Sequence, residues 1–338
     1  GIVGATVVTM GLLSLPSMRR AGYSPAFATG TICATGTLGQ IIPPSIALVL
    51  LGDVIASAYQ RAQLEMGVVN TATVSVGDLF VGALIPGLIL VGLYLVWILL
   101  VARLKPQYAP AITSKGASIT KLVRALLPPF LLIALVLGSI LLGAATPTEA
   151  AGVGAVGALL LALLRGQMDW LKLHDIGLST MRITSMVFLI LIGAAVFTLV
   201  FRGFGGEELV QGFFERMNLG PQGAMLLVMI VIFLLGFILD FIEITFVVVP
   251  IVGPILLAMG FDPIWFGIML AVNLQTSFLT PPFGFALFYL RGVAPDTVTT
   301  GSIYKGVIPF VALQIGLLAL LWSFPDLVTW LPNVLRSG

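Results

Sequence analysis

The chain contains two apolar segments that are interrupted in the same way. GYSPAF and GTLGQIIPPS, near its start, recur 238 positions later as GFDPIW and LQTSFLTPPF. Pro43-Pro44 therefore falls on Pro281-Pro282 without a gap. A chain that breaks two apolar segments alike is typical of a duplicated membrane unit, and such breaks point to a transport site.

Composition identifies the environment of these segments. Hydrophobic residues make up 59% of the 338 positions and charged residues 9%, against roughly 45–50% and about 25% in soluble domains. Runs such as 79–102 and 126–145 can cross a hydrocarbon core of about 30 Å as helices, which satisfy their own backbone there. The sequence therefore predicts an all-α polytopic protein in a lipid bilayer. A net charge of +2, carried by loops, gives no basis for nucleic-acid binding.

Polar breaks divide the chain into helical segments. We expect an apolar arm at 5–18, an interrupted helix at 25–57, single spans at 79–102, 125–144, 148–165 and 183–201, two arms at 225–239 and 244–259, a second interrupted helix at 263–291 and a last span at 306–323. Five regions follow: 1–58 with the returning arm of an inner hairpin and the first broken helix, 59–124 with a connecting span and loop, 125–224 with further spans, 225–292 with an outer hairpin and the second broken helix, and 293–338 with the last span. We expect the first copy to be truncated at its N-terminal end, because Gly1 already lies in an apolar stretch.

Loop charges orient the spans. The loop from Arg103 to Arg124 carries five basic residues and no acid, which marks it as cytoplasmic. Counting spans from this loop places the C-terminus in the periplasm. The first broken helix then runs outward and the second inward. The sequence thus predicts inverted repeats with re-entrant hairpins and discontinuous transmembrane helices.

Each break offers helix ends to a ligand. Ser24-Pro25 and Asp262-Pro263 are typical of helix starts, and twelve residues further, at about 1.5 Å each, Gly36 and Leu274 would lie near the middle of the membrane. The carbonyls at one half-helix end suit a cation, and the amides of the next half-helix suit an anion. Side-chain oxygens at the breaks belong to Thr35, Thr37, Ser45, Asn273, Gln275, Thr276, Ser277 and Thr280. Such donors favour Na⁺ or H⁺ over a transition metal.

A simpler interpretation of the breaks stays open. Each Pro-Pro pair would kink a packed helix, and the nearby hydroxyls would bond to the freed carbonyls. Two mirrored breaks of opposite orientation favour the functional interpretation.

Three acidic residues have distinct sequence contexts. Asp240 and Glu243 lie between two apolar arms, where a hairpin tip is expected, and carboxylates at such depth are usually functional. We expect a direct ion-binding role for Asp240 and a secondary or gating role for Glu243; if the tip reaches water, they are simply solvated. Thr146-Pro147-Thr148-Glu149 instead predicts a capping box, in which Glu149 is a structural cap.

Five motifs follow one another in the order of a known family. They are GATVVTMGLLSLPSMRRAGYSP, GTLGQIIPPSI, TPTEAAGVGA, VVVPIVGPILLAMGFDPIWFG and LTPPFGFALFYLRGVAP. Together they resemble the large membrane subunit of the tripartite ATP-independent periplasmic (TRAP) transporters, in its C-terminal portion. The similarity covers essentially the whole chain.

The resemblance implies a Na⁺-coupled elevator transporter of the bacterial inner membrane that imports an organic acid anion. It implies two partners, a small membrane subunit and a periplasmic substrate-binding protein, and no cofactor besides Na⁺ as the coupling ion. Each hairpin tip would meet a broken helix at a Na⁺ site. Carried over by position, the first site comprises Gly4, Thr6, Thr37, Gly39 and Pro43, and the second Asp240, Thr276, Thr280 and Pro282. Substrate would lie between them, near Ser45 and Asn273.

Other functions are weighed against this one. A stand-alone Na⁺/dicarboxylate-type symporter without a binding protein is the main alternative. A membrane enzyme such as an intramembrane protease is disfavoured, because the sequence has no H-E-x-x-H, and Leu50 stands where a Gly-x-Gly-Asp motif needs glycine. A non-transporting scaffold subunit would leave Asp240 and the mirrored breaks without a purpose.

Overall fold

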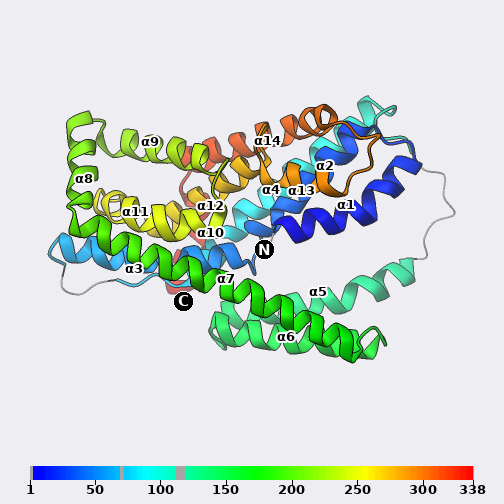
Figure 1. Ribbon diagram of the computed structural model, residues 1–338, viewed down its shortest axis with the longest axis horizontal. Helices are drawn as coiled ribbons and strands as arrows, with labels where there is room; N and C mark the ends of the chain where they lie inside the picture. Colours follow the sequence, from blue (N-terminus) through cyan, green and yellow to red (C-terminus); the bar gives the residue numbers. More distant parts are fainter. Residues whose placement is uncertain (1–2, 69–71, 112–118, 338) are drawn as a thin grey trace. The chain divides into compact units, whose positions relative to one another are not determined.

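In the computed structural model, every described element is helical (Figure 1). The structure describes residues 3–68, 72–111 and 119–337. Its helices are α1 (Val3–Arg20), α2 (Pro25–Thr37), α3 (Ile46–Glu65), α4 (Val76–Leu104), α5 (Ile119–Leu141), α6 (Pro147–Leu164), α7 (Trp170–Gly203), α8 (Gly206–Met217), α9 (Gly220–Leu235), α11 (Val249–Ala258), α12 (Pro263–Leu279), α13 (Phe285–Val293), α14 (Thr300–Ser323) and α15 (Asp326–Ser337). Short helical turns are η1 (Leu38–Gln40), α10 (Phe241–Glu243) and η2 (Ile244–Val248).

Two compact units divide the chain. Residues 1–112 and 198–338 form the first unit, and residues 113–197, with α5, α6 and most of α7, form the second. In the second unit α5 packs against α6. A Cβ on Gly157 of α6 would lie 2.4 Å from a methyl of Leu132, so the absence of a side chain at Gly157 allows this close approach.

Long apolar helices confirm a polytopic membrane protein. Six segments within the described residues are long and apolar enough to cross a membrane: α4, α5, α6, α7, α14 and the continuous stretch Phe241–Ala258. The single spans expected from the sequence correspond to the first five of these. The sixth combines α10, η2 and α11, where a hairpin arm is expected.

Both broken helices start as expected. The side chain of Ser24 accepts the Phe27 N–H at 3.2 Å at the start of α2, and that of Asp262 accepts the Trp265 N–H at 2.8 Å at the start of α12. Tyr23 stacks on Phe27 with ring centroids 6.1 Å apart, and Phe261 stacks on Trp265 at 5.6 Å. Positions 238 residues apart thus share their caps and their aromatic contacts.

Helix α12, the first half of the second broken helix, is longer than expected. The prediction of a break beside Leu274 is wrong, because α12 continues to Leu279 and has 17 residues. No helix-breaking residue precedes Pro281, so the chain stays helical until Thr280 takes the extended backbone that a following proline favours. In the first copy, η1 similarly carries the chain past Thr37 to Gln40 before the break.

Contacts with α4 define the directions of α2 and α12. The Ser24 N–H, at the start of α2, donates to the carbonyl of Tyr108, just beyond the last turn of α4, at 3.0 Å. Ile264, at the start of α12, instead packs against Gly82 near the beginning of α4. Because α4 is 29 residues long, α2 and α12 begin beside its opposite ends.

Helices α9 and α11 form a hairpin. The chain leaves α9, turns at α10 and returns through η2 and α11 (Figure 1). In this turn Phe241 is buried and Ile238 is exposed. Helix α9 packs against α12, and α11 packs against α3. The hairpin therefore contacts one half of each broken helix.

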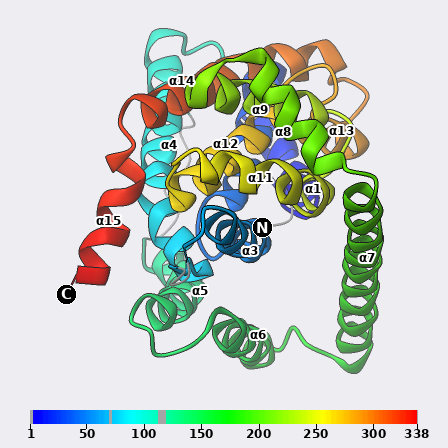
Figure 2. The same ribbon diagram turned by 90° about the vertical axis from the view of Figure 1, so that its left-hand side faces the viewer.

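The amphipathic helices α8 and α15 are not expected from the apolar runs. Helix α8 follows Gly205, whose φ is +73°, a left-handed conformation that glycine adopts without strain. Helix α15 packs along α4 and also contacts α12 (Figure 2). A search of the sequence for long apolar segments misses both helices, because charged residues interrupt their apolar positions.

Candidate functional site

Both breaks are short non-helical segments of turns and bends around a Pro-Pro pair. The first lies between η1 and Ser45, which caps α3, and the second lies between Thr280 and Gly284, after which α13 begins. The Pro-Pro peptide bond is cis in both. Both breaks belong to the first unit. At each break the helix that ends presents carbonyls without helical partners, and the helix that begins presents amides.

Threonine hydroxyls at the breaks bond to their own helices. Those of Thr35, Thr37, Thr276 and Thr280 each donate to a carbonyl three or four residues earlier, at 2.7 or 2.8 Å. This is the bonding that the simpler interpretation of the breaks predicts. Because donation uses only the proton, the hydroxyl oxygen keeps lone pairs with which it can coordinate a cation.

The residues proposed for the first cation site lie on neighbouring elements. Gly4 and Thr6 are at the start of α1, Thr37 ends α2, Gly39 is in η1, and Pro43 is in the break. A Cβ on Gly36 would lie 2.4 Å from Val7, so the start of α1 contacts the end of α2 closely. The structure thus brings the α1 and α2 residues of this set together.

Asp240 and Glu243 form a capping box at the turn between α9 and α11. The Asp240 carboxylate accepts the Phe241 N–H at 2.7 Å, while the Glu243 carboxylate accepts the Asp240 N–H at 2.5 Å. Glu243 therefore holds the backbone of Asp240 in place. The carboxylate of Asp240 keeps acceptor sites beyond this one bond.

Tyr289 of α13 lies against the start of α1, because its ring would lie 3.0 Å from a Cβ on Gly4. The Tyr304 hydroxyl donates to the carbonyl of Pro282, within the second break, at 3.0 Å. A Cβ on Gly236, four residues before Asp240, would lie 2.5 Å from the Ser277 hydroxyl oxygen of α12. The turn that carries Asp240 therefore begins beside the second broken helix.

The two residues proposed for substrate have separate partners. The Ser45 hydroxyl donates to the Gln40 carbonyl at 2.7 Å, and the Asn273 side-chain amide donates to the Met229 carbonyl of α9 at 2.8 Å. Both side chains are buried, and no hydrogen bond joins them within the described residues. Asn273 lines a cavity of about 370 Å³ between α9, α12 and α14, with otherwise largely apolar walls.

Glu149 has the structural role expected for it. Its carboxylate accepts the Thr146 N–H at 2.8 Å and the Thr146 hydroxyl at 2.9 Å, while the Thr146 hydroxyl oxygen accepts the Glu149 N–H at 3.3 Å. This capping box starts α6 in the second unit.

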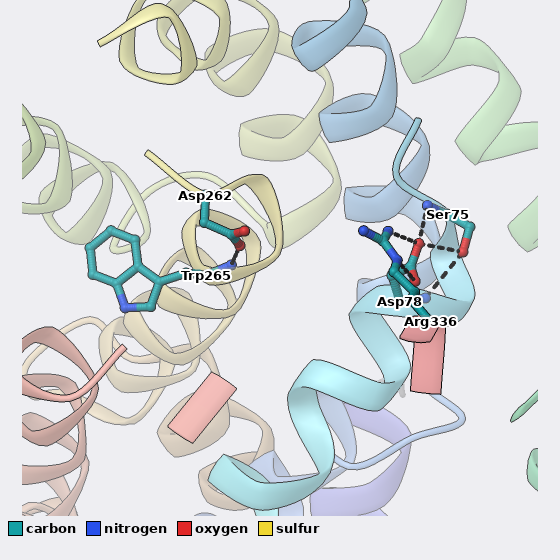
Figure 3. Close-up of polar contacts among 5 residues, drawn as sticks. All are labelled: Ser75, Asp78, Asp262, Trp265 and Arg336. Carbon is teal, nitrogen blue, oxygen red and sulfur yellow. Dashed lines mark hydrogen bonds and ion pairs between the residues drawn. The ribbon is translucent and has the colours of Figure 1, made fainter. Parts of the chain in front are cut away.

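The structure adds a polar clamp that sequence reasoning missed. Arg336 of α15 contacts Asp78 of α4 through two N–O pairs, at 2.6 and 3.0 Å, and Asp78 also caps α4 together with Ser75 (Figure 3). The hydrogen bonds that Arg336 donates to Asp78 raise the pKa of its guanidinium. The partners are 258 positions apart, so the sequence has no local signal for the pair.

A second missed cluster lies along α3. Asp53, Ser57 and Arg61 recur every four residues, so they share one helix face, and they line a cavity of about 310 Å³ beside Phe246. Arg61 pairs with Glu207 of α8 at 3.3 Å. The i, i+4 spacing of these polar residues could have indicated the cluster from the sequence.

The comparisons with known proteins agree on one family. Residues 1–327 match the family described as tripartite ATP-independent periplasmic transporter, DctM component. The chain is 32% identical to the C4-dicarboxylate TRAP transporter large permease protein DctM of Pseudomonas aeruginosa, over 97% of this chain and 73% of the relative. It is 28% identical to the sialic acid TRAP transporter large permease protein SiaM of Vibrio cholerae, over 96% of this chain and 72% of the relative. It is 26% identical to the ectoine/5-hydroxyectoine large permease protein UehC of Ruegeria pomeroyi, over 100% and 74%.

Proposed function

This chain belongs to the DctM component family of the tripartite ATP-independent periplasmic transporters, and on that premise we propose that it imports an organic acid anion in symport with Na⁺. The family consists of multi-pass membrane permeases rather than enzymes, and the six long apolar helices agree with that class. No cofactor besides the coupling ion belongs to the proposal.

The observation that carries the proposal is the relation of the two broken helices. They start beside opposite ends of α4, share their caps and aromatic contacts at positions 238 apart, and break inside the same unit. An inverted repeat accounts for this arrangement, and in such repeats the discontinuous helices bind ions and substrate near the middle of the membrane.

The cations would bind where each helix end meets the neighbouring element. At the first break, α2 and η1 both contact α1, and the carbonyls at their ends would give neutral oxygen ligands of the kind that Na⁺ accepts. At the second, Asp240 would supply a carboxylate, and Thr276, Thr280 and the backbone at Pro282 would supply neutral oxygens. Glu243 would act indirectly, by holding Asp240.

The anion would bind at the starts of α3 and α13. Their free amides carry partial positive charge, which suits a carboxylate. Ser45 stands at the first of these starts, and Asn273 would contribute from α12. Relatives named for C4-dicarboxylates and for sialic acid support an organic acid as the substrate class.

An elevator movement fits the division into two units. Both breaks and the α9–α11 hairpin belong to the first unit, which is compact by itself and would carry the ligands. The second unit contains none of the proposed ligands. In the proposal the protein lies in the bacterial inner membrane with a periplasmic C-terminus, and it works with a small membrane subunit and a periplasmic substrate-binding protein.

The test is uptake of a radiolabelled organic acid by proteoliposomes that contain the complete large subunit and both partners. We expect uptake with an inward Na⁺ gradient and near-background uptake without it. Equal uptake under the two conditions would rule out Na⁺ coupling. Undiminished uptake after the binding protein is omitted would favour the alternative, a stand-alone Na⁺/dicarboxylate-type symporter.

A further inference from the structure

One buried hydrogen bond joins the two broken helices at equivalent positions. The side-chain amide of Gln275 in α12 donates to the hydroxyl of Thr37 at the end of α2, over 3.3 Å, and the two residues are 238 positions apart. This is the offset that relates the two copies of the repeat. If a twofold rotation relates the copies, a contact between equivalent residues lies at the rotation axis, midway between the two breaks.

The bond has a fixed direction. Thr37 uses its hydroxyl proton on the Ala34 carbonyl at 2.8 Å, so its oxygen is left to accept from Gln275. Both side chains are fully buried, and the carbonyl oxygen of the Gln275 amide has no hydrogen-bond partner within the described residues. Thr37 therefore provides the hydrogen bond that orients the Gln275 amide.

The bond also lies next to both proposed cation sites. Thr37 belongs to the first site and leads directly into η1, whereas Gln275 precedes Thr276 of the second site. A cation that draws in the carbonyls at the end of α2 would displace the Thr37 oxygen, and the Gln275 amide would follow the oxygen to which it donates. The displacement reaches α12 one residue before a proposed ligand.

We propose that Gln275 is a positioning residue that couples the two cation sites, so that Na⁺ bound at one break favours Na⁺ binding at the other. This inference rests on the proposed function, because it needs two sites. It assigns the cooperativity of Na⁺ binding to one hydrogen bond, and the coupling acts equally in both directions.

The chain offers a chemically matched control. Gln314 of α14 donates its side-chain amide to the Tyr94 hydroxyl of α4 at 2.8 Å, and this pair is also buried. The carbonyl oxygen of that amide likewise lacks a partner within the described residues. The Gln314 bond joins α14 to α4 and involves neither broken helix, so its loss should affect stability without changing the coupling between the cation sites.

The experiment measures uptake against Na⁺ concentration in proteoliposomes with the complete transporter. We expect a Hill coefficient above 1 for the unchanged protein, approaching 2 for two strongly coupled sites. Gln275→Met keeps the side chain's size and removes the donor, and we expect a Hill coefficient of about 1. Thr37→Val should lower it likewise, Thr37→Ser should preserve it, and Gln314→Met should leave it unchanged while lowering the melting temperature.

The outcomes separate the two proposals. Na⁺-independent uptake by the unchanged protein overturns both. Cooperative Na⁺ dependence that persists in Gln275→Met overturns the coupling role alone. If Gln275→Met does not fold, Thr37→Val decides, and a preserved Hill coefficient in that variant overturns the inference. An equal loss of cooperativity in Gln314→Met would also overturn it, because the effect would then be general loosening.

Discussion

At the first break the chain resumes from Ser45, whose hydroxyl donates to Gln40 and accepts from the Leu48 N–H, whereas at the second it resumes from Gly284, which has no side chain to offer. The residue equivalent to Ser45 is Phe283, which is 54% exposed. One break is thus lined by a buried hydroxyl and the other by an exposed aromatic ring. The two share geometry and differ in chemistry.

The same contrast holds for charge. Asp240 brings a carboxylate to the turn beside the second broken helix, while the equivalent position in the first copy of the sequence is Ile2. The first proposed site therefore depends on neutral oxygens and the second has a negative charge in addition. In the proposal, a duplication supplied two helix breaks, and later substitutions made two unlike cation sites from them. Four variants test or sharpen this contrast.

The largest effect is expected at Gly284. A Cβ there would lie 2.6 Å from the Phe278 carbonyl oxygen, which cannot move without shifting the end of α12. We expect Gly284→Ala to reduce the uptake rate about 100-fold, the order of loss that a 1 Å misplacement of a site causes. The control is Ile46→Ala at the equivalent position of the first break, where the side chain is 51% exposed. Equal losses in both variants would contradict the difference between the breaks.

Asp240→Asn should have the next largest effect. Removing the charge weakens the second cation site, since ligand charge sets cation affinity over orders of magnitude. We expect the Na⁺ concentration for half-maximal uptake to rise at least about tenfold. Asp53→Asn, a change of the same kind on an exposed face of α3, serves as the control and should leave this concentration unchanged. An unchanged Na⁺ dependence in Asp240→Asn would remove the carboxylate from the site.

Ser45→Ala should have a moderate effect at the first break. It removes the hydroxyl that caps α3, which is worth about 1 kcal/mol of helix stability. A loss of the same size in the free energy of binding would lower substrate affinity about fivefold. Thr299→Ala removes a similar cap from α14, where the hydroxyl accepts the Ser302 N–H at 3.2 Å. We expect the half-saturating substrate concentration to rise only in Ser45→Ala. A rise in both would show that capping alone is responsible.

The smallest effect is expected at Glu149 in the second unit. Glu149→Gln weakens the capping box of α6, so thermal unfolding should occur at a slightly lower temperature. The Na⁺ dependence of uptake should not change, because Glu149 lies at neither break. A shift in Na⁺ dependence without a loss of stability would instead make Glu149 part of an ion site.

Features encoded locally could be predicted from the sequence. Proline pairs, N-caps at Ser24 and Asp262, and the box at Glu149 depend on neighbours within a few residues, and the structure confirms them. The end of α12 does not follow from membrane thickness, because Pro281 determines where the helix stops.

Contacts between distant segments could not be predicted. The pairs Asp78–Arg336 and Arg61–Glu207 join residues 258 and 146 positions apart, and sequence periodicity on one helix says nothing about its partner. The bond from Gln275 to Thr37 is an intermediate case. The offset of the repeat relates these positions, but only the packing of α2 against α12 reveals that they touch.

Direct binding of ²²Na⁺ to the purified complete transporter tests whether the two breaks form two unlike cation sites. We predict two bound ions per large subunit in the unchanged protein and one in Asp240→Asn at the same Na⁺ concentration. A single ion in the unchanged protein, or two ions bound equally well after Asp240→Asn, would contradict the claim.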